Sequence, residues 1–131
     1  MLVDTQGLVM HALVHSAGVQ DRDGGALVLA TLFGRYPFLR KLFADGGYQG
    51  KRFRRAAKKA MATVTVEIVK RSDKAKGFVV LPKRWIVERS LGWLGRCRRL
   101  ARDWENLNRK ALAFLRLASI RVMLRKLCNP S

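Results

Sequence analysis

Two acidic residues, Asp45 and Glu88, have sequence surroundings that suit metal-dependent chemistry on phosphate groups. Asp45 follows the apolar residues Leu-Phe-Ala and directly precedes a glycine-rich turn, whereas Glu88 lies among arginines. Magnesium ions prefer a few carboxylate oxygens and keep positions for water and phosphate. Two such ions, about 3.5 to 4 Å apart, can activate a hydroxyl group and stabilise the leaving oxygen when a phosphodiester bond is cleaved. Composition alone does not establish this chemistry, which also depends on the helix and the strand that position the two acids.

The segment KRWIVERSLGWLGRCRRLARDWE, residues 83–105, predicts a long helix with one apolar and one basic face. At about 100° per residue, the predicted core face holds Ile86, Ser90, Trp93, Leu94, Cys97, Leu100, Ala101 and Trp104. The opposite face holds Arg84, Glu88, Gly92, Gly95, Arg99 and Arg102. Because glycine costs a helix interior about 1 kcal/mol relative to alanine, the two glycines predict the close approach of a bulky anionic ligand. The simpler interpretation is a solvated ion pair between Arg84 and Glu88, which stabilises a helix by only a few tenths of a kcal/mol.

The charge of the chain predicts a polyanionic partner. The 131 residues include 27 basic and 9 acidic residues, which gives a formal net charge of +18, and binding to a nucleic acid should therefore depend strongly on salt. Basic residues fall in three blocks, at 51–59, in the predicted helix and at 109–126, each interleaved with apolar residues. This pattern favours an extended nucleic-acid surface over a disordered tail. The residues expected to contact phosphates are Lys51, Arg52, Arg54, Arg55, Arg84, Arg96, Arg99 and Arg102.

Other residue types add little chemistry. Cys97 and Cys128 are too few for a disulfide framework and have no metal-binding spacing, so we expect reduced, packed thiols. His11 and His15 have no cysteine or acid at metal spacing and are expected to be structural, while Trp85 either packs at the helix end or contacts a splayed base. No apolar run approaches the roughly 18 residues that span a membrane, and no signal sequence is recognisable. We expect a cytoplasmic, nucleoid-associated protein that does not contact membranes.

The order of the expected elements predicts an α/β fold in one domain, residues 1–131. Strands are expected at 1–5 and 8–15, then a helix after Gly18 with Asp21 or Asp23 at its N-terminus and an end before Pro37. A strand should end at Ala44 and place Asp45 at its carboxyl end, where ligands bind in open α/β sheets. A basic helix (51–62), a strand (63–70), a charged loop (71–77) and a segment that extends a strand or leads into the long helix (78–82) follow. A last helix, 109–127, should bury Leu112, Leu115, Ala118, Ile120, Val122 and Met123.

The segments ADGGYQG and RWIVERSLGWLGRCRRLARDWE resemble the C-terminal catalytic part of transposases of the IS5 type, within the IS4-like group of DDE transposases. HSAGVQDRDGG resembles the segment that follows their early strands, so the resemblance covers essentially the whole chain. It implies a ribonuclease-H-like domain in which two aspartates and a glutamate surround two ions, Mg²⁺ or Mn²⁺. Asp45 in Asp-Gly-Gly-Tyr matches the second acid, and Arg84 with Glu88 matches the R-x3-E of the signature Y-x2-R-x3-E-x6-K. The implied reaction is strand cleavage at element ends and transfer of the 3′-hydroxyl, with Arg84 and Arg96 holding phosphates.

The sequence departs from the family pattern at three positions. Leu81 stands at the signature tyrosine, and Gly95 stands at the lysine, with Arg96 one residue later. No residue matches the first aspartate, since Asp4 aligns with the following strand and Glu67 is expected to be an ordinary strand residue. We therefore expect an incomplete ribonuclease-H-like fold that lacks its first, central strand, leaves two strand edges unpaired, and binds metal and cleaves DNA only in the complete protein.

These observations leave two classes of function open. The first is a truncated transposase catalytic domain whose partners are element ends, target DNA, and an upstream transposase segment or the intact transposase. The second is a non-catalytic basic protein, which either binds DNA and modulates transposition or binds RNA, for example at the ribosome. An upstream overlapping frame that encodes a strand ending in aspartate would favour the first class.

Overall fold

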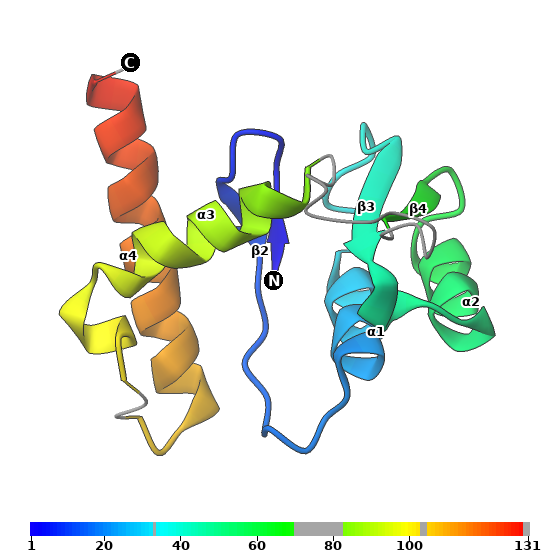
Figure 1. Cartoon of the computed structure of the whole chain (residues 1–131), viewed down its shortest axis with the longest axis horizontal. Coiled ribbons are helices and arrows are strands. Elements are labelled where there is room, and N and C mark those ends of the chain that lie inside the picture. Colours follow the sequence, from blue (N-terminus) through cyan, green and yellow to red (C-terminus); the bar gives the residue numbers. More distant parts are fainter. Residues whose placement is uncertain (33, 70–82, 103–104, 130–131) are drawn as a thin grey trace, which may run out of the picture. The chain divides into compact units, whose positions relative to one another are not determined.

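The computed structural model describes residues 1–32, 34–69, 83–102 and 105–129, and the chain forms two compact units. Unit 1 contains Met1–His15 and Ile86–Ser131, and unit 2 contains Ser16–Trp85. Within the described ranges there are four α-helices and two separate two-stranded sheets (Figure 1). The protein is therefore a small mixed α/β structure. The expected charged loop (71–77) and the segment expected to extend a strand or lead into the long helix (78–82) lie outside the described residues.

Unit 1 begins with the predicted hairpin, which is shorter than expected. Strands β1 (Leu2–Val3) and β2 (Val9–His11) pair antiparallel, with an irregularity in their register. The turn between them is closed by Asp4, whose Oδ1 accepts the backbone N–H groups of Gln6 at 2.9 Å and Leu8 at 2.8 Å. Asp4 thus has a structural role in the turn.

Helix α3 (Arg84–Gly95) packs on this hairpin through the predicted core face. Ile86, Ser90 and Leu94 are buried. The Ser90 hydroxyl lies 2.6 Å from the carbonyl oxygen of Gly7 and 2.8 Å from that of Ile86. Gly7 has φ +82°, and a Cβ atom there would lie 2.9 Å from Ser90 Oγ. The hairpin turn can therefore approach α3 only because residue 7 is a glycine.

Substitution of Gly7 by alanine is expected to destabilise unit 1. An L side chain in the left-handed region costs about 1 to 2 kcal/mol, and the methyl group would also displace Ser90. Denaturant unfolding of the full chain should show this loss. Gly18→Ala is the matched control, because a Cβ atom at Gly18 would meet no atom within 4 Å. Equal stabilities of the two variants would contradict the prediction.

The predicted helix 83–105 is wrong beyond Gly95, where α3 ends. Cys97 is extended (φ −82°, ψ 109°) and is followed by the short 3-10 helix η2 (Arg98–Leu100). Glycine is a weak helix former, and the closely spaced cations Arg96, Arg98 and Arg99 repel one another. Consequently, of the residues predicted for the core face, Cys97 and Leu100 are only half-buried and Ala101 is exposed. Trp104, the last residue of that predicted face, lies outside the described residues. Arg96, Arg99 and Arg102 do not continue the helical face of Glu88.

Helix α4 (Asn108–Cys128) completes unit 1 and confirms the last predicted helix. Ala118 and Ser119 are buried, and Leu115 and Val122 are half-buried on the same inner side. Ile120 was predicted to lie in the core, but its side chain is 51% exposed. The prediction was wrong because α4 carries apolar residues on both its inner and its outer face.

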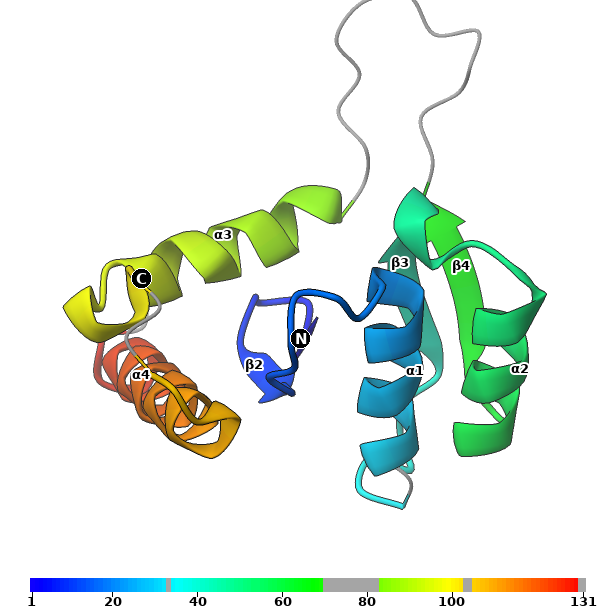
Figure 2. The ribbon, with the colours of Figure 1, turned by 90° about the horizontal axis from the view of Figure 1, so that it is seen from below.

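Unit 2 consists of two helices packed against a pair of parallel strands. Helix α1 (Asp21–Thr31) and helix α2 (Lys51–Ala60) lie side by side, and strands β3 (Lys41–Asp45) and β4 (Thr65–Val69) lie behind them in the view of Figure 2. The strand register runs from Lys41 opposite Thr65 to Asp45 opposite Val69. The core of this unit contains Val28, Leu29, Leu32, Leu42, Phe53 and Ala57. The N-cap of α1 is Gln20, and Asp21 and Asp23 lie in the first turn, which confirms the predicted acids at the helix N-terminus although neither is the N-cap.

No helix in the described part of the chain is both long enough and apolar enough to span a membrane.

Candidate metal and nucleic-acid site

Asp45 lies where the sequence predicted it, at the carboxyl end of a parallel strand. It is the last residue of β3 and caps the 3-10 helix η1 (Gly46–Tyr48), with Oδ1 accepting the backbone N–H of Gly47 at 2.9 Å. The residue is exposed. A carboxylate has about four lone-pair positions on its two oxygens, so the bond to Gly47 leaves capacity for a cation. The backbone thus fixes the direction of this carboxylate without saturating it.

A second carboxylate, which the sequence analysis did not select for the site, lies beside Asp45. A Cβ atom built on Gly47 would lie 3.1 Å from Asp45 Oδ1 and 3.9 Å from Asp21 Oδ2, so the two acids flank the Gly47 backbone. Asp21 lines an open depression of about 610 Å³ together with Ala17, Val19, Gln20, Arg22, Gly46, Gly47 and Gln49, and Asp45 directly precedes the two lining glycines. The order of the elements was the signal that could have identified Asp21 from the sequence. Helices that alternate with parallel strands begin near the ligand-binding edge of the sheet, and Asp21 lies at the start of such a helix.

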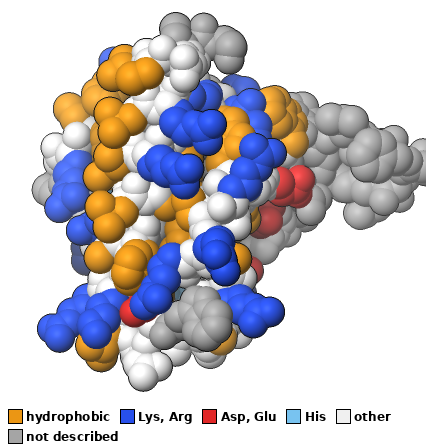
Figure 3. Space-filling model, turned by 90° about the vertical axis from the view of Figure 1, so that its left-hand side faces the viewer, with side chains coloured by type: hydrophobic (Ala, Val, Ile, Leu, Met, Phe, Trp, Pro, Cys, Tyr) orange, Lys and Arg blue, Asp and Glu red, His pale blue; other side chains and the backbone are white. Residues whose placement is uncertain are grey.

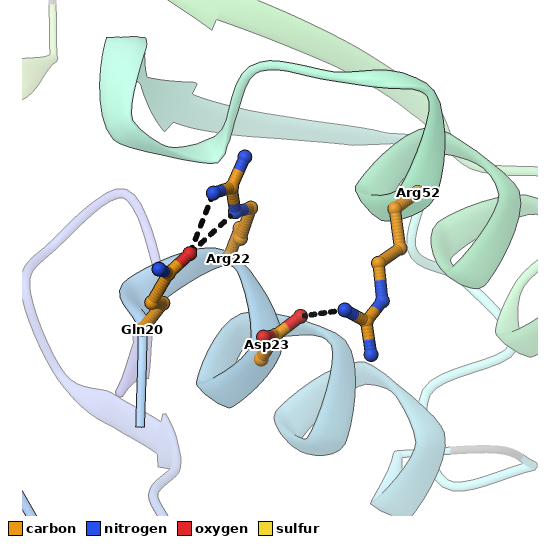
Figure 4. A network of polar contacts seen from close by, with 4 residues as sticks. All are labelled: Gln20, Arg22, Asp23 and Arg52. Carbon is orange, nitrogen blue, oxygen red and sulfur yellow. Dashed lines mark hydrogen bonds and ion pairs between the residues drawn. The ribbon is translucent and has the colours of Figure 1, made fainter. Parts of the chain in front are cut away.

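Figure 4 shows how the first turn of α1 is tied to its surroundings. The Arg22 guanidinium donates to Gln20 Oε1, with Nε at 2.9 Å and Nη2 at 2.5 Å. Arg52 of α2 reaches across to Asp23, with Nη1 and Oδ1 separated by 3.3 Å. Asp23 therefore joins the two helices of unit 2, whereas Asp21 lies on the side of the depression.

Tyr48 holds the turn after Asp45 against α1. Its ring packs on Phe53 at 5.3 Å between centroids, and a Cβ atom on Gly25 would lie 2.5 Å from Tyr48 Cε1. Burial raises the pKa of Tyr48 above its ordinary value of 10.0, and the charges of Asp21 and Asp45 raise the pKa further. The phenol therefore stays neutral beside the two carboxylates, and its ring fixes the position of η1.

The raised pKa of Tyr48 predicts a loss of stability at high pH. The unfolded chain releases the phenolic proton from about pH 10, while the folded chain still holds it. The unfolded state then binds fewer protons, so the free energy of unfolding falls as pH rises through this range. Denaturant unfolding between about pH 9 and 11 should show a shallower fall for Tyr48→Phe than for wild type. Comparison at pH 7 is the control, because the phenol is neutral there in both states; parallel curves would contradict the prediction.

The first block of predicted DNA-contacting residues lies on the outer side of α2. Phe53 and Ala57 are buried, while Lys51, Arg52, Arg54 and Arg55 are exposed, as are Lys58 and Lys59. Arg52 is partly neutralised by Asp23. The helix therefore presents a dense row of cations to solvent in unit 2, the unit that holds Asp45.

Glu88, the other predicted metal ligand, is exposed on α3 in unit 1. Arg84 begins this helix, but its side chain lies outside the described part of the structure. Cβ atoms at Gly92 and Gly95 would meet nothing within 4 Å, which agrees with an open surface there. Asp45 belongs to unit 2, so the meeting of Asp45 and Glu88 at one metal site is part of the proposal below.

The remaining predicted phosphate contacts follow α3, and one of them is engaged within unit 1. Arg99 donates from Nε to Glu105 Oε1 at 2.8 Å, and its guanidinium lies 4.9 Å from the centre of the Phe114 ring. The Glu105 side chain is only 10% exposed. Arg96 and Arg102 are exposed. Arg99 therefore holds η2 against α4, whereas Arg96 points its charge to solvent.

Two further cations serve the packing of unit 1. Arg89 Nη2 donates to the carbonyl oxygen of Gln6 at 2.7 Å, and Lys126 Nζ donates to the same oxygen at 3.3 Å. The Arg89 guanidinium and the Lys126 ammonium also lie over the Trp93 ring, at 4.7 Å and 4.8 Å from its centre. The net charge of the chain thus overstates the number of cations that face a partner.

The donor set near Asp45 fits a hard divalent cation better than a soft one, because it offers exposed carboxylate oxygens. In the described ranges, no group of three or more His, Cys, Asp or Glu residues is arranged to hold a metal ion. Both cysteines are free, and they lie in unit 1. Among the described residues, metal binding would therefore rest on one or two carboxylates together with further groups.

A protein-family model described as Transposase DDE domain matches residues 1–123, a range that includes residues of both units. The chain belongs to this family. Domains of this family generally act on DNA and use divalent metal ions, which agrees with the exposed carboxylate of Asp45 and the basic surface of α2. No curated protein and no solved structure matched the chain.

Proposed function

We propose that this chain is the C-terminal catalytic part of an insertion-sequence transposase of the IS5 type, with a ribonuclease-H-like fold over residues 1–131. The family match over residues 1–123 supports the class of function. The structural observation that supports a specific site is the position of Asp45. It is the last residue of β3, at the carboxyl edge of a parallel strand pair and beside a glycine-rich turn. The same position is the ligand-binding edge of open α/β sheets.

A strand from an upstream transposase segment, or from an intact transposase, completes the sheet in this proposal. Among the described residues, β1 pairs with β2 and β3 pairs with β4, in two separate sheets. A two-stranded sheet is marginal on its own, and an open edge is a template for another strand. A strand that pairs with both sheets would also bring the first aspartate of the family to the carboxylate of Asp45.

Asp45 and Glu88 are the proposed metal ligands, and Mg²⁺ or Mn²⁺ is the proposed ion. When bound, the ions activate the attacking hydroxyl group and stabilise the leaving oxygen of a phosphodiester bond. The Gly47 N–H orients the Asp45 carboxylate, and Arg84 and Arg96 hold the phosphates next to the cleaved bond. The exposed cations of α2 bind the flanking DNA. The proposed reaction is cleavage at the element ends followed by transfer of the 3′-hydroxyl to target DNA, in the cytoplasm at the nucleoid.

The experiment uses the full chain, alone and mixed with the segment encoded immediately upstream. The DNA probe is the native genomic region that flanks the coding sequence, with a random duplex of equal length as control. We expect salt-dependent DNA binding by the chain alone and Mg²⁺-dependent cleavage of the flanking DNA only in the mixture. Cleavage by the chain alone would contradict the need for an added strand. Absence of cleavage together with equal binding to both duplexes would contradict the transposase function.

The alternative is a non-catalytic protein that binds DNA or RNA and modulates transposition. The net charge of +18 and the row of exposed cations on α2 favour it, because both act without chemistry. Structured RNA added to the same binding experiment separates the two functions. Tighter binding to RNA than to the flanking duplex, without cleavage in any mixture, would favour the alternative.

A further inference from the structure

The outer face of α4 carries an apolar stripe that the packing of unit 1 leaves uncovered. Leu117, Ile120, Leu124 and Leu127 are 61%, 51%, 54% and 77% exposed. We call these four residues the α4 seam. Figure 3 views this side of the molecule and shows hydrophobic side chains in a column, with Lys and Arg beside them. Monomeric proteins seldom leave such an ordered apolar row in water.

The spacing of the α4 seam is that of a helix-packing surface. Its members are separated by 3, 4 and 3 residues, which is the a/d pattern of a coiled coil. At about 1.5 Å per residue the seam is roughly 15 Å long. Ala113, which is also exposed, lies one step before Leu117 in the same pattern. The narrow stripe fits a single partner helix.

The charge of α4 determines which kind of partner helix can bind the α4 seam. Helix α4 contains six basic residues and no acidic residue. At about 100° per residue, Arg109 and Arg116 lie along one side of the seam, and Arg121 lies along the other; all three are exposed, as is Lys110. Arg109, Arg116 and Arg121 occupy the flanking positions that set partner choice through interhelical ion pairs, whereas Lys110, seven residues before Leu117, continues the a/d row itself. A complementary helix therefore carries Asp or Glu on both sides of its apolar stripe.

We propose that the α4 seam is a docking site for an acidic amphipathic helix of another protein segment. A second copy of α4 would place like charges along both sides of the seam, which is unfavourable. A lipid surface is less suited, because interfacial helices present a broad apolar face with Trp or Phe, whereas this seam has neither and the inner apolar residues of α4 face unit 1. The site is independent of the proposed metal ligands, and the inference does not rest on the proposed catalytic function.

The test uses a synthetic helical peptide with leucine at four a/d positions and glutamate at the flanking positions. The control peptide has the same charge but serine in place of the four leucines, which separates seam binding from simple attraction to a basic protein. Fluorescence anisotropy with the full chain should show at least tenfold tighter binding of the leucine peptide. Similar affinities of the two peptides would overturn the proposal.

The matched variants locate the contact. Ile120→Ser with Leu124→Ser should weaken binding of the leucine peptide at least tenfold, while Leu91→Ser, at a residue of α3 that is 56% exposed, should leave it unchanged. Arg109→Gln with Arg116→Gln should reduce the salt dependence of binding. Thermal unfolding confirms that each variant is folded. If the leucine peptide binds the seam variant as tightly as wild type, the proposal fails.

The same variants test whether a second copy of the chain or a lipid surface occupies the α4 seam instead. Sedimentation of the full chain measures self-association, and flotation with vesicles of anionic and neutral phospholipids measures lipid binding. We expect a monomer and no seam-dependent lipid binding. A dimer, or vesicle binding, that is lost in Ile120→Ser with Leu124→Ser would assign the seam to that occupant and overturn the proposal.

Discussion

Replacement of Asp45 by asparagine is expected to lower Mg²⁺-dependent cleavage at least about 100-fold in the mixture of this chain with its upstream segment. Loss of groups that merely orient a metal ligand costs about 10- to 100-fold, so loss of a ligand should cost at least as much. The asparagine still accepts the N–H of Gly47, so the η1 turn should persist. Glu88→Gln should have an effect of the same size. Initial cleavage rates at saturating protein measure both.

The controls for this prediction are carboxylates that the structure assigns to ion pairs. Asp23 pairs with Arg52. Glu67 pairs with Lys41 across the β3–β4 pair, with 2.5 Å between Lys41 Nζ and Glu67 Oε2. Surface pairs contribute about 0 to 1 kcal/mol, so Asp23→Asn and Glu67→Gln should cleave at nearly the wild-type rate. DNA binding by Asp45→Asn should remain normal. A rate for Asp45→Asn within threefold of wild type would remove Asp45 from the site.

The local signals around Asp45 were sufficient to predict its position. An apolar run followed by Asp-Gly-Gly-Tyr predicted a strand that ends at the aspartate, and β3 ends there. The basic segment after Gly50 predicted a basic helix over 51–62, and α2 forms over Lys51–Ala60 with Phe53 and Ala57 buried. In both cases neighbouring residues determine the structure, because strand ends and amphipathic faces depend on short-range pattern.

The predictions that failed depended on residues far apart in the sequence. Apolar periodicity continued past Gly95, but the chain turns there and Arg99 reaches Glu105 and Phe114 instead of extending α3. The inner and outer faces of α4 are both apolar, so periodicity could not assign Ile120 to either. Asp21 was missed because its approach to Asp45 requires the packing of α1 beside η1. Composition could not predict the ion pairs of Arg52 and Arg99 either, because each depends on how the folded chain brings the arginine to its carboxylate.

These ion pairs change what the net charge means for DNA binding. Lys41, Arg52 and Arg99 each face a carboxylate, and Arg89 and Lys126 contact Gln6 and Trp93. A cation that already has an acidic partner releases fewer counterions from a phosphate, because its partner repels the DNA. Affinity should therefore follow the exposed cations of α2 rather than the total charge.

Simultaneous replacement of Lys51, Arg54 and Arg55 by glutamine is expected to weaken DNA binding on the order of 100-fold at about 0.1 M salt. Each phosphate contact contributes about 0.9 to the slope of log K against log salt, so the slope should become less steep by about 2.7. The side chains are exposed, and the buried Phe53 and Ala57 are unchanged, so α2 should remain folded. Anisotropy titrations of one duplex over a range of salt concentrations measure both quantities.

The matched control removes the same number of charges from the cations that face acids, by replacing Lys41, Arg52 and Arg99 with glutamine. The net charge falls by three in both variants, from the +18 of the wild type. If total charge governs binding, the two variants should lose affinity equally and their salt slopes should match. The structure predicts a smaller change in slope for the control, because these three cations are engaged with Glu67, Asp23 and Glu105. Equal slopes would therefore refute the assignment of the DNA surface to α2.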